Sequence, residues 1–432
     1  MLHSETAKNT LFLIKSIITD YLLFIVRNLK FFLPIMIISF IQASFWQLGV
    51  LSLLSKGLNI GHSGMMVGHY YMVLSLLVIP SGWIADKWNK KFITCVGYVA
   101  LFLSGVCIAF GNDIYKSLGM IFFGIGTSFI TIPQKIFVLD TLRSSQQGSV
   151  KTKGDIFNCF EICKRSTMIA GAFISWRLLS INNSLPWLVW SVLSIIAIIT
   201  VLRLPKSQPN LSVSPVPKGS SLPLIQVFKS IVVITAMILS GIEMGIRSII
   251  LNPYLTHILT GDIASLQLNA LIQAFSGIFG TILYKFIDKK LENSSYFGSK
   301  ENQAAFFVAL SMMIYSCWDM ICAFTESYSI FLSTSAIAIV TMGWYFPLLD
   351  SLVEESSDTN WRSRALSFVS IAQNASAGIT LYILNIIEIS IEDIRQYWAI
   401  GSVFLFTGSL FIFLIPLQNI VSARKIKIAK SI

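Results

Sequence analysis

The amino-acid sequence predicts an all-α polytopic membrane protein with about twelve transmembrane helices, arranged as two pseudo-symmetric six-helix bundles. Two observations predict membrane insertion: the mean hydropathy is +0.72, and charged residues make up only 12% of the chain. A third observation predicts the two bundles: a short loop with acidic and basic residues at Asp86 recurs in weaker form at Asp288. The separation of these two loops in the sequence is that expected for a six-span repeat.

Long apolar runs alternate with short polar segments along the chain. Each run is long enough to cross a hydrocarbon core of roughly 30 Å as a helix. The expected spans are residues 31–54, 63–85, 92–111, 114–139, 155–178, 185–203, 228–256, 264–287, 303–324, 328–353, 364–387 and 396–419.

The basic residues indicate the orientation of the chain in the membrane. The chain has 32 Lys and Arg against 21 Asp and Glu, a net charge of +11. Most of the basic residues fall in segments on the same side as both termini, which the positive-inside rule places in the cytoplasm. We therefore expect cytoplasmic N- and C-termini in a plasma membrane or bacterial inner membrane. The lipid bilayer is the expected partner of these charges, and nucleic acid is not.

A change of composition divides the chain into two halves. Five prolines within residues 204–226, together with serine and lysine, indicate an extended cytoplasmic linker. The expected N-terminal bundle covers 31–203 and the C-terminal bundle 227–420. Residues 1–30 are expected to form a cytoplasmic interfacial helix, and residues 421–432 a basic cytoplasmic tail.

No pattern for a metal site or an enzyme is present in the sequence. The six Cys fall in or at the edges of expected spans without zinc-type spacing, and the four His are scattered. Neither a phosphate-binding loop nor a nucleophile elbow occurs. We expect no cofactor, no metal, no catalytic residue and no enzymatic activity.

The segment from Gly82 to Lys91 joins the second and third expected spans. It reads Gly-Trp-Ile-Ala-Asp-Lys-Trp-Asn-Lys-Lys and resembles the signature loop of the major facilitator superfamily. Asn89 stands where that pattern has a second glycine, so we expect a left-handed backbone there. The resemblance implies the major facilitator fold and a loop that packs against the start of the eleventh span. The conformational-switch set expected from it is Gly82, Asp86, Lys87, Lys90, Lys91, Asp288 and Arg364.

Charged residues inside the expected spans mark a candidate site, because such residues are costly in lipid. The fifth span carries Glu161 one turn before Lys164 and Arg165, so the three share one helix face. The seventh span carries Glu243 and Arg247 at i,i+4, an ion pair able to act as a gate. The full set of substrate-binding or coupling candidates is Lys135, Glu161, Lys164, Arg165, Glu243, Arg247, Asp350, His69 and Gln42.

A second, weaker resemblance is to the proton-coupled oligopeptide transporters. The fourth span reads Gly-Thr at 126–127 and Pro-Gln-Lys at 133–135, and the fifth reads Phe-Asn-Cys-Phe-Glu-Ile at 157–162. Residues 42–45 read Gln-Ala-Ser-Phe where that family has the Glu-x-x-Glu-Arg motif of proton coupling. The resemblance implies peptide transport. The Gly and Pro residues of the fourth span also predict a breakable helix.

The buried charges indicate the kind of solute. Four cations and four acids are expected inside the bundle, and Asp319 and Asp350 are among the acids. This balance suits a zwitterionic solute, with one carboxylate free to carry a proton. We expect a monomeric secondary active transporter of a small peptide- or amino-acid-like substrate, with protons as the coupling ion. The alternative functions are an organic-anion or sugar-phosphate antiporter and an exporter of small amphiphilic compounds. The alternative role of the buried charges is that of ion pairs that only hold helices together.

Overall fold

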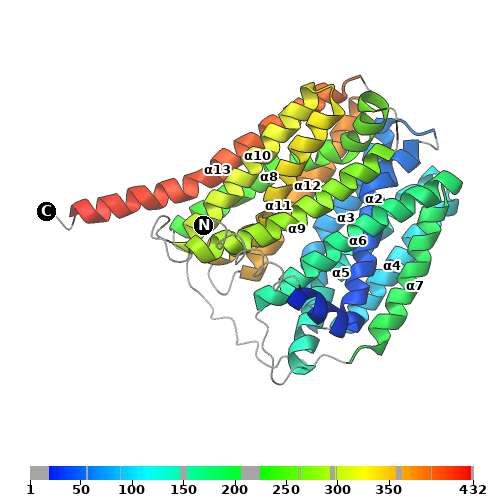
Figure 1. Cartoon of the computed structure of the whole chain (residues 1–432), viewed down its shortest axis with the longest axis horizontal. Coiled ribbons are helices and arrows are strands. Elements are labelled where there is room, and N and C mark those ends of the chain that lie inside the picture. Colours follow the sequence, from blue (N-terminus) through cyan, green and yellow to red (C-terminus); the bar gives the residue numbers. More distant parts are fainter. Residues whose placement is uncertain are drawn as a thin grey trace, which may run out of the picture.

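A computed structural model of the chain describes residues 19–54, 57–87, 89–145, 153–205, 224–260, 262, 264–291, 297, 299–356, 362–390 and 392–429. In these residues it contains twelve long helices and one short π-helical segment (Figure 1). They are α2 (Leu29–Leu54), α3 (Ile60–Lys87), α4 (Lys90–Phe110), α5 (Asp113–Ser145), α6 (Lys153–Ile181), α7 (Leu185–Arg203), α8 (Leu224–Pro253), η1 (Tyr254–Leu259), α9 (Ala264–Leu291), α10 (Lys300–Phe324), α11 (Tyr328–Ser356), α12 (Arg362–Ile386) and α13 (Ile394–Ala429).

The helices confirm the predicted all-α polytopic architecture. Each expected span coincides with one long helix, and the ends differ by only a few residues, apart from the longer C-terminal extension of α13. In the described part of the chain, 11 helices are long and apolar enough to cross a membrane. The long helix outside that set is α6, which carries Lys164 and Arg165. It packs against α2 and α9, so protein surrounds much of its surface.

The helices form two halves with the same packing plan. In the first half α2 packs on α6, α3 on α5, and α4 on both α5 and α7. In the second half the helices six places later repeat every one of these pairs: α8 with α12, α9 with α11, and α10 with α11 and α13. Figure 1 shows the first half in blue to green and the second in green to red. Two pseudo-symmetric six-helix bundles are therefore confirmed.

The two halves meet most extensively along two pairs of helices, α3 with α12 and α6 with α9. At the first contact Gly61 lies against Asn385, and a Cβ added to it would stand 3.2 Å from the Asn385 Cα. Further along the same contact, a Cβ on Gly378 would meet the Met72 side chain at 2.8 Å. Small residues let these two helices approach closely, as they do at many helix interfaces in membranes.

The predicted segments outside the bundles are described only in part. Of the expected N-terminal helix, residues 1–18 lie outside the described residues, and 19–27 are helical. Phe24 of that helix packs edge-on against Phe32 at 6.0 Å between ring centroids, while Leu22 and Val26 are exposed. Residues 206–223 of the expected linker are also outside the description. The expected tail begins within α13, which continues to Ala429 and extends beyond the other helices (Figure 1).

The helix of the fourth span runs without interruption through Pro133, from Asp113 to Ser145, so its ability to break stays a prediction. One local prediction is wrong. Asn89 does not adopt a left-handed backbone: its φ is −67° and its ψ is 118°. Its side chain instead accepts a hydrogen bond from the Lys91 backbone N–H at 3.0 Å, so that it caps the N-terminus of α4.

Candidate functional site

A cavity of about 330 Å³ lies between the two halves of the molecule. Its walls come from α2 and α6 of the first half and from α8, α10, α11, α12 and α13 of the second. A cavity between packed helices, lined by apolar groups and a few polar ones, is the usual form of a small-molecule site. The charged and amide side chains that line it are Gln42, Lys164, Arg165, Glu243, Arg247 and Gln373.

Glu243 and Arg247 form the ion pair that their spacing on α8 predicts. The Arg247 Nε donates to a Glu243 carboxylate oxygen at 2.6 Å, and the Glu243 side chain is almost fully buried. The Arg247 Nη1 donates to the Tyr315 hydroxyl of α10, and the guanidinium stacks 4.8 Å from the centre of the Tyr315 ring. Because the Arg247 side chain is still 25% exposed, the guanidinium remains open to the cavity while it holds both partners.

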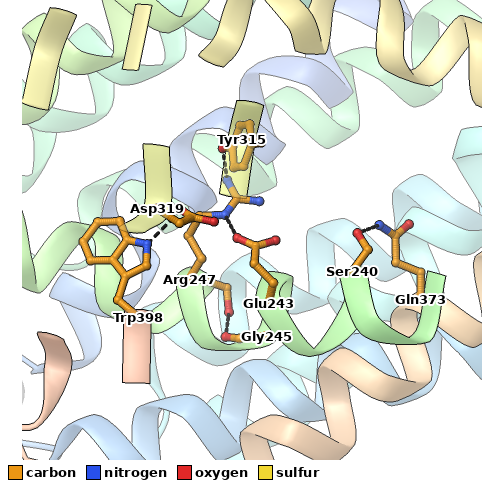
Figure 2. A network of polar contacts seen from close by, with 9 residues as sticks. Ser240, Glu243, Gly245, Arg247, Tyr315, Asp319, Gln373 and Trp398 are labelled. Atoms are coloured by element: carbon orange, nitrogen blue, oxygen red, sulfur yellow. Dashed lines mark hydrogen bonds and ion pairs between the residues drawn. The ribbon is translucent and has the colours of Figure 1, made fainter. Parts of the chain in front are cut away.

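Asp319 of α10 is the second carboxyl group of this cluster. It is fully buried, and its Oδ1 accepts a hydrogen bond from the Trp398 indole of α13 at 2.8 Å. The Asp319 carboxyl also interacts electrostatically with Glu243 and Arg247. Figure 2 shows it between the Trp398 indole and the Glu243–Arg247 pair. Three helices of the second half thus converge on one guanidinium and two carboxyl groups.

Lys164 and Arg165 bring positive charge to the cavity from the first half. The Lys164 Nζ lies 5.8 Å from the centre of the Phe346 ring of α11. The Arg165 Nη2 donates to the Met342 carbonyl of α11 at 3.4 Å. A Cβ added to Gly277 of α9 would stand 2.1 Å from the Arg165 Nη1, so this glycine makes room for the guanidinium. Both cations therefore cross the boundary between the halves.

Neutral groups complete the cavity wall. Gln373 of α12 donates from its Nε2 to the Ser240 hydroxyl of α8 at 3.2 Å (Figure 2). Gln42 of α2 faces the cavity from the other half. The apolar part of the wall includes four methionines, whose flexible side chains adapt to irregular shapes. They are Met168, Met244, Met312 and Met342.

Three predicted residues with described side chains lie away from the cavity. His69 of α3 packs edge-on against Tyr382 of α12, with 5.6 Å between ring centroids, at the contact between the halves. Lys91 donates from its Nζ to the carbonyls of Leu202 and Leu204 at 2.7 and 2.6 Å, and so caps the C-terminus of α7. Lys90 begins α4 beside it.

Other predicted residues are described only by their helical backbone, and their side chains lie outside the described part of the structure. Among the binding and coupling candidates these are Lys135, Glu161 and Asp350. In the conformational-switch set they are Gly82, Asp86, Lys87, Asp288 and Arg364. The expected contact between Asp86 and the start of the eleventh span therefore stays a prediction.

The observed site also contains four residues outside the predicted set, namely Tyr315, Asp319, Trp398 and Gln373. Tyr315 and Asp319 stand four residues apart on α10, so they share a helix face, and this spacing was a usable signal. Trp398 and Gln373 are single residues on other helices, and no local pattern connects them with Glu243. Among the described residues, no group of three His, Cys, Asp or Glu could hold a metal ion.

Part of the chain matches a known family model. Residues 3–158 match the sequence model described as the Major Facilitator Superfamily. No curated protein matches the chain significantly.

Solved structures match nearly the whole chain. A peptide transporter POT in complex with sulfate superposes with a TM-score of 0.70 at 13% identity, covering 90% of this chain and 94% of that chain. The nucleoside transporter NupG gives 0.66 at 16%, covering 89% and 98%. The POT family transporter PepTSo gives 0.66 at 12%, covering 92% and 98%. The chain is therefore an integral membrane protein with the major facilitator fold, and its residues 3–158 carry the sequence features of that superfamily.

Proposed function

We propose that the protein is a monomeric secondary transporter that moves a small organic solute by alternating access, with both termini in the cytoplasm of a plasma or bacterial inner membrane. The observation that carries this proposal is the central cavity, which takes charged residues from both halves. A solute bound there contacts Lys164 and Arg165 on one side and Glu243 and Arg247 on the other. Rocking of the halves about such a site exposes it to each side of the membrane in turn.

The solute carries at least one anionic group. The three cations Lys164, Arg165 and Arg247 reach the cavity from two helices in opposite halves. Guanidinium groups bind carboxylate and phosphate oxygens in a fork geometry, which orients the solute as well as attracting it. The methionine and aromatic side chains of the wall accommodate an apolar body attached to that group.

A zwitterionic, peptide- or amino-acid-like solute is the first candidate. Glu243 supplies a carboxylate on the cavity wall that can receive an ammonium group opposite the cations. Among the solved structures of the same fold are peptide transporters of the POT family. The proposal of proton coupling rests on the same carboxylate, because protonation of Glu243 would release Arg247 for the substrate.

An organic-anion or sugar-phosphate substrate is the second candidate, favoured by one observation. Among the described side chains of the cavity wall, three are cationic and only Glu243 is acidic. Asp319 is fully buried behind Arg247 and does not line the wall. A basic excess of this kind suits a solute with negative charge and no amine.

Thermal stabilisation of the purified protein by a solute panel tests the substrate class. The panel holds di- and tripeptides, their N-acetylated forms, amino acids, nucleosides, dicarboxylates and sugar phosphates. A solute that binds the folded protein raises its melting temperature. We expect stabilisation by anionic members that is lost in Arg247→Gln and kept in Arg395→Gln, whose ion pair with the exposed Glu326 lies outside the cavity. Loss of binding on N-acetylation supports the zwitterion, whereas stabilisation by uncharged nucleosides alone contradicts the anionic substrate.

A further inference from the structure

The two carboxyl groups beside Arg247 form a pair whose charge the single guanidinium does not balance. We propose that Asp319 and Glu243 together hold one proton at rest, and that the same carboxyl pair binds the coupling proton of the transport cycle. The shared proton is inferred from the contacts of the cluster. The role of the pair in coupling rests on the transport function proposed above.

Charge counting supports the proton. With both acids ionised, the cluster carries two negative charges and one positive charge in the interior of the bundle. An uncompensated charge at such a depth is costly, and buried acids commonly bind a proton instead. One proton on the pair makes the cluster neutral while Glu243 keeps its ion pair with Arg247.

The positions of the carboxyl oxygens show where the proton belongs. The Asp319 Oδ1 accepts from the Trp398 indole, but Oδ2, also buried, has no hydrogen-bond donor among the described residues. The Asp319 and Glu243 carboxyl groups interact electrostatically, and Figure 2 shows both of them beside the Arg247 guanidinium. Two ionised carboxylates have only acceptor atoms, so they repel each other. A proton on Asp319 removes this repulsion and makes Asp319 a hydrogen-bond donor toward Glu243.

The surroundings of Asp319 offer no second strong cation among the described groups that act on it. Glu243 and Arg247 face it from α8, and α13 contributes the neutral Trp398 indole. Its own helix contributes the neutral Tyr315 and Cys322. Where the third packed helix, α11, meets this part of α10, it contributes the neutral Phe331, whose ring centroid lies 6.0 Å from that of Trp318. The charge on the pair is therefore set by Arg247 and by whatever binds to Arg247.

The cluster then links substrate and proton. An anionic group that enters the cavity competes with Glu243 for the open side of Arg247. Once Glu243 is displaced, its negative charge loses its counter-ion, and the carboxyl pair takes a second proton from water on the same side. After the halves rock, release of the substrate returns Arg247 to Glu243 and expels that proton to the other side. Each cycle therefore moves one proton together with one anionic group.

Infrared spectroscopy of the purified protein tests the shared proton without any substrate. The carbonyl stretch of a protonated carboxylic acid is separate from that of a carboxylate, and isotope labelling of Asp assigns it. At neutral pH we expect such a band in the wild type and in Glu326→Gln, whose side chain is 83% exposed. Asp319→Asn removes the band, and so does Glu243→Gln, because Asp319 then ionises as the partner of Arg247. Absence of the band in the wild type, or its survival in Asp319→Asn, overturns the shared proton.

A second variant tests the shared proton if Asp319→Asn does not fold. Trp398→Phe removes only the indole donor to Oδ1, which favours the ionised form of Asp319. The band of this variant therefore persists to higher pH than in the wild type. A pH dependence identical to that of the wild type contradicts the assignment of the proton to Asp319.

Transport by Glu243→Gln tests the coupling role separately, because this variant has no acid for the substrate to displace from Arg247. In proteoliposomes it is expected to exchange labelled substrate across the membrane, but a proton gradient no longer drives accumulation. Accumulation by Glu243→Gln as in the wild type overturns the coupling role while the infrared result stands. Failure of the wild type to transport any member of the panel contradicts the proposed function, and the infrared result is again unaffected.

Discussion

The Arg247 Nε lies 2.6 Å from a carboxylate oxygen of Glu243, one helical turn earlier on α8. The carboxylate is almost fully buried, whereas a quarter of the arginine side chain is exposed at the cavity. Because of this difference in exposure, a solute in the cavity can approach Arg247 before it displaces Glu243.

Two substitutions of Arg247 distinguish the contribution of its charge from that of its planar, forked shape. Arg247→Gln leaves two buried carboxyl groups without a cation, and breaking a buried ion pair in this way costs about 3–5 kcal/mol. We expect a lower melting temperature and no substrate binding. Arg247→Lys keeps the charge but loses the fork geometry and the stacking on Tyr315, so it is expected to fold and to bind more weakly. Equal substrate affinity in the lysine variant and the wild type would exclude bidentate recognition.

Gly277 is expected to control the position of Arg165. A methyl group at this position of α9 collides with the guanidinium at 2.1 Å, and the guanidinium is the flexible end of its side chain. Gly277→Ala therefore keeps the fold but displaces Arg165 from the boundary between the halves, which weakens substrate binding. The matched control is Gly401→Ala, where the nearest atom stands at 3.4 Å. Melting temperature and substrate affinity are measured for both, and reduced affinity in the control alone would contradict the explanation.

The contact between α3 and α12 is expected to open during transport. A Cβ at position 61 stands 3.2 Å from the Asn385 Cα, so cysteines introduced at both positions lie close enough to be joined. Joining them holds this end of the two halves together and stops transport, and reduction restores it. Each single cysteine variant, treated with the same oxidant, is the control. Full transport by the joined protein would show that the halves do not separate here.

Lys91 is expected to contribute to stability rather than to substrate affinity. Its ammonium group caps two carbonyls at the end of α7, and α7 packs on α4. Lys91→Ala removes both hydrogen bonds at a half-buried position, which we expect to lower the free energy of unfolding by about 1 kcal/mol. Lys91→Arg keeps the donors and serves as the control. A tenfold loss of substrate affinity with unchanged stability would indicate a different role.

The helices could be predicted from the sequence because each apolar run carries its own signal. Burial of Lys164 and Arg165 against protein also follows from the high cost of charges in lipid. The role of Asn89 was misread because it was compared with the glycine of a family pattern. The physical signal was local: an Asn directly before a helix accepts from the first backbone N–H groups.

Asp319 illustrates what sequence alone could not supply. Its place in the cluster depends on Trp398, which lies 79 residues away, and on Glu243 in a different helix. No periodicity on α10 shows which side of that helix faces the other two. The packing of α10 on α13 brings the three side chains together, and that packing is a property of the whole half.

Uptake into proteoliposomes tests the central claim most directly. Labelled di- and tripeptides and labelled organic anions are supplied with and without an inward proton gradient, to the wild type and to Glu243→Gln. The account predicts gradient-driven accumulation of an anion-bearing solute by the wild type, and exchange without accumulation by the variant. Accumulation that is equal in both proteins, or that ignores the gradient in the wild type, would contradict coupling through the Glu243–Arg247 pair.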